Sequence, residues 1–400
     1  MWEQIRSNQM RSAILVAGMG VLLLLLGYFM GIYFFNDAIA GMVIALIVWG
    51  IMNLVAYFQG DSILLAVSGA HKITRDDHPR LYNIVEEMKI ASGLEKMPDI
   101  YIIDDPALNA FATGRSPDKA SVAVTSGLLQ KLNRDQLQGV IGHEMAHVKN
   151  RDVLLMSMAG IILGTIVIIA WYASRMLFYG GMSGGRRDSR RGGGGQGQII
   201  ILAIGIIFMI LAPIAAQLLY FAVSRKREYL ADASSALYTR YPEGLAQALE
   251  KIAGSTTQLK SANQATAPMY TVNPFRQQGR AAADLSSTHP PISERVRILR
   301  AMAGASPADY ERAYQQVKGR GIVPASALAA AGTVSLRSAS AVSREEAADN
   351  IERARETSGL MYRLGNYRTI NCNCGTTLRV PATFPASSIK CPHCGRVHQL

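Results

Sequence analysis

Long apolar runs alternate with polar stretches along this chain of 400 residues. Four runs are uniform and long enough to cross a bilayer, which takes about 20 residues. They cover residues 13–35, 38–57, 154–171 and 199–221. The first two hold only Asp37 as a formal charge between Arg11 and Asp61, whereas buried helices of soluble domains are rarely so uniform. The pattern therefore predicts four transmembrane helices.

The polar stretch between the second and third runs has mixed periodicity. Apolar residues recur at helical spacing over residues 80–94, and "DIYIIDDP" is typical of a short strand. The segment "NAFATGRSPDKASVAVTSGLL" predicts two strands joined by a turn, and Asn133 or Asp135 then suits the N-cap of a helix. We expect an α+β membrane protein with four transmembrane helices, a mainly helical domain and a small β-sheet.

The last hundred residues have a different composition. Two polar-faced helices are expected, over residues 303–321 and 344–362, on either side of an Ala/Ser-rich stretch typical of a linker. The predicted organisation is two transmembrane helices in 1–57, a main domain in 58–302 that includes the third and fourth spans, helical segments and a linker in 303–365, and a small domain in 366–400.

The motif "HEMAH" within "GVIGHEMAHVKNRD" suggests metal chemistry. On a helix, His143 and His147 lie one turn apart on one face, so both imidazoles can bind one ion. Zinc suits nitrogen and carboxylate ligands and leaves a position for water, whose proton Glu144 can accept. The same spacing also arises by chance on amphipathic helices, so a third ligand decides between the two interpretations.

The candidate third ligand is Glu228 in "SRKREYLADASSALY". Two predicted spans separate it from His147, and an even number of crossings returns the chain to the same side of the membrane. Asp232 follows one helical turn later and can accept a hydrogen bond from a zinc-bound histidine. The alternative for Glu228 is a surface carboxylate paired with Arg225 or Lys226.

All four cysteines fall near the C-terminus, as Cys372, Cys374, Cys391 and Cys394. Two thiolate pairs on tight Gly-containing turns predict a closed tetrahedral zinc site of the zinc-ribbon kind. Disulfide pairing is the alternative, and a reducing cytoplasm disfavours it. We therefore expect two zinc ions, one catalytic and one structural.

The formal net charge is +12, but the basic residues do not form one stripe, so no nucleic acid is expected as a partner. They flank the predicted spans on the side shared by the N-terminus, residues 58–153 and the C-terminal part, which predicts that this side is cytoplasmic. The loop between the third and fourth spans is also rich in arginine, which argues against this orientation.

The motifs "NAFATG", "VTSGLL", "HEMAH", "SRKREYLADASSA" and "STHPPISERVRIL" stand in the order found in HtpX-type membrane zinc metalloproteases, which residues 1–302 resemble. The resemblance implies an endopeptidase of the gluzincin kind in the inner (plasma) membrane, with several spans and with its site and C-terminus facing the cytoplasm. It also implies protein substrates and a role in membrane protein quality control.

The resemblance assigns roles to individual residues. It implies that His143, His147 and Glu228 bind zinc, that Glu144 is the general base, and that Asp232 orients a ligand.

Two further residues match family positions with less specificity. His289 would stabilise the oxyanion of the tetrahedral intermediate, although a histidine before two prolines also suits a turn. Arg295 would bind Glu228 or the substrate, or be a solvated helix charge. An edge strand against which the substrate backbone pairs is expected at Asn109, Ala110, Phe111, Ala112 and Thr113.

Two alternatives to a membrane endopeptidase remain open. One is a non-catalytic membrane scaffold that binds partners through its ribbon; Glu144 argues against it, because a structural zinc site needs no carboxylate beside a ligand. The other is a prenyl-protein protease, which would have more spans. The ribbon is expected to recruit protein substrates, and the oligomeric state is not defined by the sequence.

Overall fold

The computed structural model describes residues 2–154, 225–260, 270–271, 289–322, 332–340 and 346–400, with the short stretches 166, 168–172, 175, 206, 210–211, 214 and 328. The predicted third and fourth spans, 154–171 and 199–221, lie mostly outside the described residues, as does the arginine-rich loop between them.

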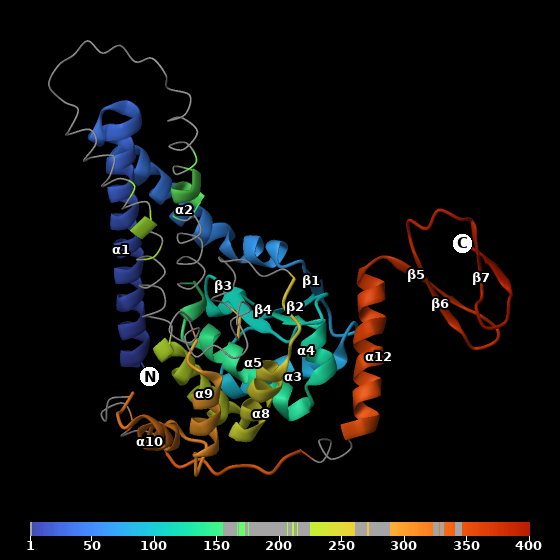
Figure 1. The fold of residues 1–400 in the computed structure, drawn as a ribbon. Coiled ribbons are helices and arrows are strands. Elements are labelled where there is room, and N and C mark those ends of the chain that lie inside the picture. Colours follow the sequence, from blue (N-terminus) through green and yellow to red (C-terminus); the bar gives the residue numbers. More distant parts are fainter. Residues whose placement is uncertain are drawn as a thin grey trace.

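Helices α1 (Trp2–Phe35) and α2 (Ala38–Val67) pack side by side and project from the rest of the molecule (Figure 1). Asp37 caps α2 by accepting a hydrogen bond from the Ile39 amide at 2.8 Å. Gly31 and Gly41 bring the two backbones together, because a Cβ on Gly31 would lie 2.7 Å from the Gly41 Cα. Such small-residue contacts are typical of helices that pair in a bilayer.

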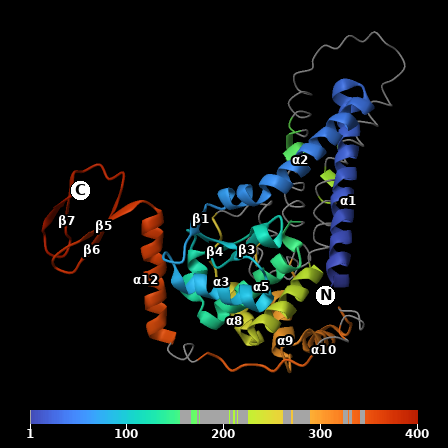
Figure 2. The same ribbon diagram turned by 180° about the vertical axis from the view of Figure 1, so that it is seen from behind.

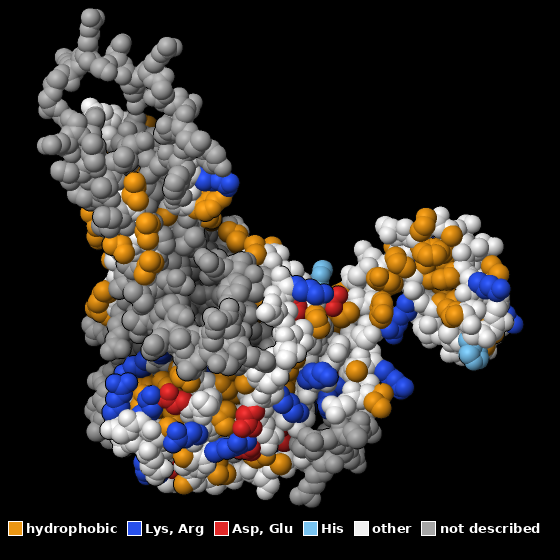
Figure 3. All heavy atoms as spheres, in the orientation of Figure 1, with side chains coloured by type: hydrophobic (Ala, Val, Ile, Leu, Met, Phe, Trp, Pro, Cys, Tyr) orange, Lys and Arg blue, Asp and Glu red, His pale blue; other side chains and the backbone are white. Residues whose placement is uncertain are grey.

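Among the described residues, α2 is long and apolar enough to cross a membrane, and α1 contains a shorter apolar stretch, Val16–Ile32. The large apolar side chains of α2 between Ile39 and Phe58 are mostly exposed, and hydrophobic side chains line the projecting helices in Figure 3. Lys and Arg side chains gather on the globular part below them. Helix α2 also continues ten residues beyond the predicted second span, and its end, with Leu64 and Leu65, packs on the sheet.

The sheet has the strand order β1-β2-β4-β3, which leaves β3 at one edge. The strands are β1 (Ala70–Ile73), β2 (Asp99–Ile103), β3 (Ala110–Gly114) and β4 (Ala120–Thr125). Strands β2 and β4 are parallel, and the other pairs are antiparallel. The sequence pattern predicted β2, β3 and β4, but not the short β1.

Helices pack on the sheet and on one another around the main core (Figure 2). They are α3 (Pro79–Ser92), α4 (Ser126–Lys131), α5 (Arg134–Lys149), a helix over 225–239, α8 (Pro242–Gly254), α9 (Ile292–Arg300) and α10 (Pro307–Lys318), and a short 3₁₀ turn, η1 (Pro117–Lys119), precedes β4. Asn133, not Asp135, caps α5, in a capping box with Gln136. Gly139 lets α5 approach α8, since a Cβ there would lie 2.6 Å from the Leu245 amide nitrogen.

The C-terminal part begins with α12 (Glu346–Leu364), which packs on α4 and buries Leu360 in the main core. Two hairpins follow, β5 (Tyr367–Asn371) with β6 (Thr377–Pro381), and β7 (Ser388–Lys390) with β8 (Val397–Gln399). They lie beyond α12, away from the sheet (Figure 1).

The Ala/Ser-rich stretch expected to be a linker is in contact with the main domain over residues 332–340. Arg337 donates to Asp135 Oδ1 at 2.8 Å, and its own amide donates to the Arg240 carbonyl at 2.9 Å. Ser340 donates to Asp135 Oδ2 through both its amide and its hydroxyl, each at 2.9 Å. Composition alone does not reveal this attachment, because it depends on a few polar side chains and backbone groups within a stretch of mostly small residues.

Candidate metal centre

Three side chains from two helices converge on one point. His143 and His147 project from one face of α5, and Glu228 comes from the helix over 225–239. The Nε2 atoms of the two histidines lie 3.3 Å apart, and each of these atoms lies 3.4 Å from an oxygen of Glu228. The predicted third ligand is therefore beside the histidine pair, and its alternative role as a surface carboxylate is excluded because Glu228 is buried.

The distances and charges fit a divalent cation. Zinc bonds of 2.0–2.1 Å in a tetrahedron separate neighbouring ligand atoms by about 3.3–3.4 Å. Glu228 Oε2 is buried and, among the described residues, has no hydrogen-bond partner, as expected of an oxygen that binds a metal. A histidine binds a metal through its neutral imidazole. With both histidines neutral, four carboxylates (Glu144, Asp152, Glu228, Asp232) and two guanidinium groups (Arg227, Arg295) meet at the site, leaving two negative charges in excess for a cation to neutralise.

Asp232 fixes the orientation of His143. Its Oδ1 lies 3.0 Å from His143 Nδ1, which leaves Nε2 facing the point of convergence. Arg295 donates two hydrogen bonds, of 2.6 and 2.8 Å, to the same carboxylate, and its Nη1 lies 3.7 Å from Glu228. Burial by itself would lower the pKa of His143, but the hydrogen bonds to Asp232 and Glu228 outweigh it and raise the pKa. The predicted contact of Arg295 with Glu228 is thus secondary to its pair with Asp232.

Asp152 has the same relation to the other histidine, and the sequence did not reveal it. Its Oδ2 lies 3.4 Å from His147 Nδ1, and its Oδ1 lies 3.6 Å from Arg227 Nε. Burial opposes protonation of His147, but contacts with Asp152 and Glu228 raise its pKa to about 10. Asp152 reaches this position because Arg151 adopts φ +58, a left-handed conformation that turns the chain sharply after α5. A positive φ at arginine has no sequence signature.

Glu144 lies between the metal centre and the edge strand. The Thr271 hydroxyl donates to its Oε1 at 2.7 Å and also lies 3.0 Å from the Ala110 carbonyl oxygen. The segment from Asn109 to Thr113, expected to be the substrate edge strand, corresponds to β3, which begins at Ala110. The predicted base and the predicted strand are therefore adjacent.

His289 also faces the centre, with its Nε2 3.6 Å from Glu228 Oε2. Burial lowers its pKa to about 4 against the attraction of Glu228, so its imidazole is neutral near pH 7 and can donate one N–H. Its backbone lies at a bend before α9, as the alternative expected, and its side chain is buried against Glu228.

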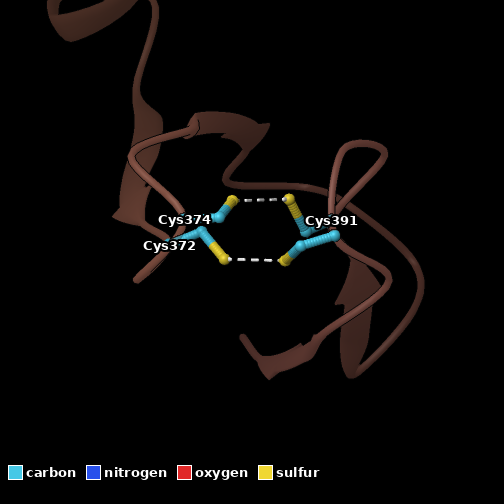
Figure 4. Close-up of side chains that lie close together, drawn as sticks. Cys372, Cys374 and Cys391 are labelled. Carbon is cyan, nitrogen blue, oxygen red and sulfur yellow. Dashed lines mark hydrogen bonds between the residues drawn. The ribbon is translucent and has the colours of Figure 1, made fainter.

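The four cysteines form a second cluster, at the ends of the two C-terminal hairpins (Figure 4). Cys372 and Cys394 place their sulfurs 3.4 Å apart, and Cys374 and Cys391 place theirs 3.7 Å apart. Zinc–sulfur bonds of 2.3 Å in a tetrahedron give about 3.8 Å between sulfurs. All four cysteines are free, which excludes the disulfide alternative in this structure. Contacts with the Thr376 side chain and backbone lower the pKa of Cys374 to about 5. At Cys394, a backbone hydrogen bond from Arg396 lowers the pKa, but hydrogen bonds with the other cysteines outweigh it and raise the pKa to about 12. Metal binding would therefore displace a proton from Cys394.

Comparisons with known proteins define the class of protein. The model of peptidase family M48 matches residues 75–303. The HtpX protease homologue of Dictyoglomus turgidum is 45% identical over 301 residues, 75% of this chain and 94% of the relative. That of Thermoanaerobacter pseudethanolicus is 41% identical over 76% of this chain and 98% of the relative.

The chain therefore belongs to peptidase family M48, and with its cluster of metal ligands it is a metalloprotease. The predicted resemblance to HtpX-type proteases is confirmed. The crystal structure of S. mikatae Ste24p is similar over 75% of this chain and 67% of its own, with a TM-score of 0.39 and 18% identity. The family match ends at residue 303, so α10, α12 and the ribbon lie outside it.

Proposed function

We propose that this protein is a membrane-anchored zinc endopeptidase that hydrolyses peptide bonds of membrane or misfolded proteins in membrane protein quality control. The observation that carries the proposal is the group His143, His147 and Glu228 with Glu144 beside it. Zinc bound there supplies a polarised water molecule and a Lewis acid for the peptide carbonyl. Glu144 accepts the proton of the attacking water and passes it to the leaving amine.

The surrounding residues hold this arrangement in place. Asp232 and Asp152 orient the two ligand histidines, and Arg295 keeps Asp232 ionised through a bidentate pair. The neutral His289 donates a hydrogen bond to the oxyanion that forms on the scissile carbonyl. Substrate backbone adds to the edge of β3 as an extra strand.

We further propose two zinc ions for each chain, the second held by the four cysteines of the ribbon, which recruits protein substrates. The chain crosses the inner membrane four times, with its catalytic site and C-terminus in the cytoplasm. The apolar α2 and the close packing of α1 against it support this arrangement. We propose the same division of the chain as the sequence predicts, with domain boundaries after residues 57, 302 and 365.

The test compares the wild type with Glu144→Gln and His143→Ala, purified in detergent, for cleavage of a membrane-protein substrate and for zinc content. Glu144→Gln should keep the zinc of the wild type and lose activity by at least about 100-fold, because only the base is removed. His143→Ala should lose activity and one zinc ion. If wild type and Glu144→Gln both held zinc and a substrate panel stayed intact with both, a non-catalytic scaffold would be the better interpretation.

A further inference from the structure

Tyr270 and Thr271 lie against the edge of β3, where a substrate strand would add to the sheet. The Thr271 amide donates to the Ala110 carbonyl at 2.8 Å, as the backbone of a neighbouring strand does. The Thr271 carbonyl accepts a hydrogen bond of 3.3 Å from Arg295 Nη1. Its backbone is thus held on both sides by groups that belong to the site.

The two side chains point to opposite faces of the sheet, as successive residues of a strand do. Thr271 faces the metal centre, where its hydroxyl donates to Glu144. Tyr270 enters the apolar cluster between the sheet and the end of α2, with its ring 5.1 Å from that of Phe111 in an edge-to-face contact. Its hydroxyl lies 3.5 Å from the Ser68 hydroxyl, and the side chain is fully buried.

This contact has a cost for catalysis. A hydrogen bond from Thr271 engages the carboxylate that has to accept a proton from water, and the bond to Ala110 uses the carbonyl that a substrate amide would need. Substrate backbone and Thr271 cannot bind Ala110 in the same way at the same time.

We propose that Tyr270 and Thr271 act as an internal pseudosubstrate, and that the pocket around Tyr270 is the subsite for an aromatic side chain of the substrate. The proposal rests on the proposed function, since it specifies which peptides that site accepts. A substrate has to displace Tyr270 and Thr271 from the edge of β3. Its apparent affinity is therefore the intrinsic affinity multiplied by the fraction of molecules in which these two residues are released. An extended peptide with an aromatic residue displaces it best, because it replaces both the backbone bond and the buried ring.

The activity test uses the full chain in detergent with β-casein as an unfolded substrate. Tyr270→Ala removes the buried anchor and should raise kcat/KM about tenfold, by increasing the competent fraction. Thr271→Val keeps the amide and the size of the side chain but releases Glu144, and should raise it as well. Tyr101→Ala is the matched control: Tyr101 packs on the same apolar cluster from β2, away from the edge, and should leave kcat/KM within about twofold of the wild type.

A fall in activity of both variants, with unchanged zinc content and melting temperature, would overturn the proposal. Tyr270 and Thr271 would then position Glu144 for catalysis instead of competing with the substrate. An equal rise in Tyr101→Ala would also overturn it, because loosening of the cluster in general would explain the gain.

Binding distinguishes this proposal from the proposed function. Peptide hydroxamates, with tyrosine or serine placed at each position in turn, are titrated against the wild type and Tyr270→Ala. At one position of the peptide, tyrosine should give binding to the wild type at least about tenfold tighter than serine does. The same tyrosine peptide should bind to Tyr270→Ala more tightly than to the wild type. Equal binding at all positions would overturn the subsite. If neither protein cleaved any substrate but this preference held, the proposed function would fail, and the pocket would stand as a peptide-binding site that Tyr270 and Thr271 occupy.

Discussion

Asp152 and Asp232 support the two histidines of the candidate metal site in the same way. Each carboxylate faces an Nδ1 atom, and each is in turn approached by an arginine, Arg227 or Arg295. Such partners fix the histidine tautomer and increase the basicity of the ligand nitrogen. They also explain why arginines can lie so close to a cation site, since each is neutralised by its own carboxylate.

Replacing Asp152 should weaken zinc binding without unfolding the protein. Asp152→Asn removes the charge beside His147 but keeps a polar group of the same size, and zinc affinity should fall by about 10–100-fold. The measurement is the zinc retained by the full chain against increasing chelator. Asp118→Asn, at an exposed position, should retain zinc like the wild type; if Asp152→Asn did so too, Asp152 would have no part in the metal site.

At the residue scale, the histidine pair and Glu144 were predicted from their local spacing, Glu228 from the predicted topology, and His289 and Arg295 from the family resemblance. Thr271 and Asp152 were not predicted. Helical spacing places His143 and His147 on one face with Glu144 beside them, and the candidate third ligand Glu228 was needed to favour a metal site over a chance pattern. Thr271 meets Glu144 across 127 residues, and no pattern in the chain links the two. Asp152 is close in sequence, but its role depends on the backbone conformation of Arg151.

At the scale of elements, α3 begins with an unusual cap. His78 accepts a hydrogen bond from the Leu81 amide through Nδ1 at 3.2 Å, so its lone pair has to be free of a proton. Burial, with the charge of Arg80, lowers the pKa of His78 to about 4. Glu356 of α12 lies 3.6 Å from the same nitrogen and opposes this shift.

His78 should therefore make stability depend on pH. The folded protein binds fewer protons than the unfolded chain between the folded pKa of about 4 and the unfolded pKa of about 6.5. The contribution of His78 is complete above pH 6.5 and is lost as the pH falls towards 4, by about 3 kcal/mol in total. Asparagine is also a good N-cap and does not titrate, so melting temperatures of His78→Asn should fall less than those of the wild type between pH 7 and 4.5. Parallel curves would contradict this role.

Residues 332–340 connect the two helices that carry the proposed metal ligands. Arg337 donates to Asp135 and Gln138 on α5 and to the Thr239 carbonyl at the end of the helix that carries Glu228. Asp135 is buried and receives Ser340 as well. The arrangement joins the start of one ligand helix to the end of the other.

Arg337→Ala should destabilise the protein by about 2 kcal/mol, because it leaves a buried carboxylate with fewer donors. Thermal unfolding in detergent would measure the effect. Arg320→Ala, at an exposed position, should have almost none. Equal melting temperatures for the two variants would show that residues 332–340 only rest on the surface.

Helices and strands were predicted where an apolar pattern runs through the whole element. Contacts that depend on single residues far apart in the sequence were not predicted. Strands β2, β3 and β4 and helices α3, α5, α10 and α12 follow from apolar spacing. The attachment of residues 332–340 does not, because Arg337 and Asp135 are 202 residues apart. Similarly, Asn133 and Asp135 are both residue types that suit an N-cap. Asn133 caps α5, and Asp135 instead accepts a hydrogen bond from the distant Arg337.

At the scale of the whole molecule, the ribbon has its own small core around Cys372, Leu378 and Cys391, separate from that of the protease. A domain of this size depends on its metal for most of its folding energy. Cys391→Ser should thus lose about one zinc ion for each chain and make residues 366–400 sensitive to added protease, while cleavage of a short peptide stays within about twofold of the wild type. Loss of peptide cleavage together with the ribbon would show that the two parts fold as one.

The attachment of residues 332–340 bears on where this chain can be divided. The family match ends at residue 303, which invites a shortened protein that stops there. Such a protein would lack the hydrogen bonds that Arg337 and Ser340 make to Asp135 and would expose the surface that Leu360 covers. Residues 332–340 and α12, which lie beyond the family boundary, are therefore part of the packing of the protease domain, and a comparison with shorter relatives is sound only when these residues are kept.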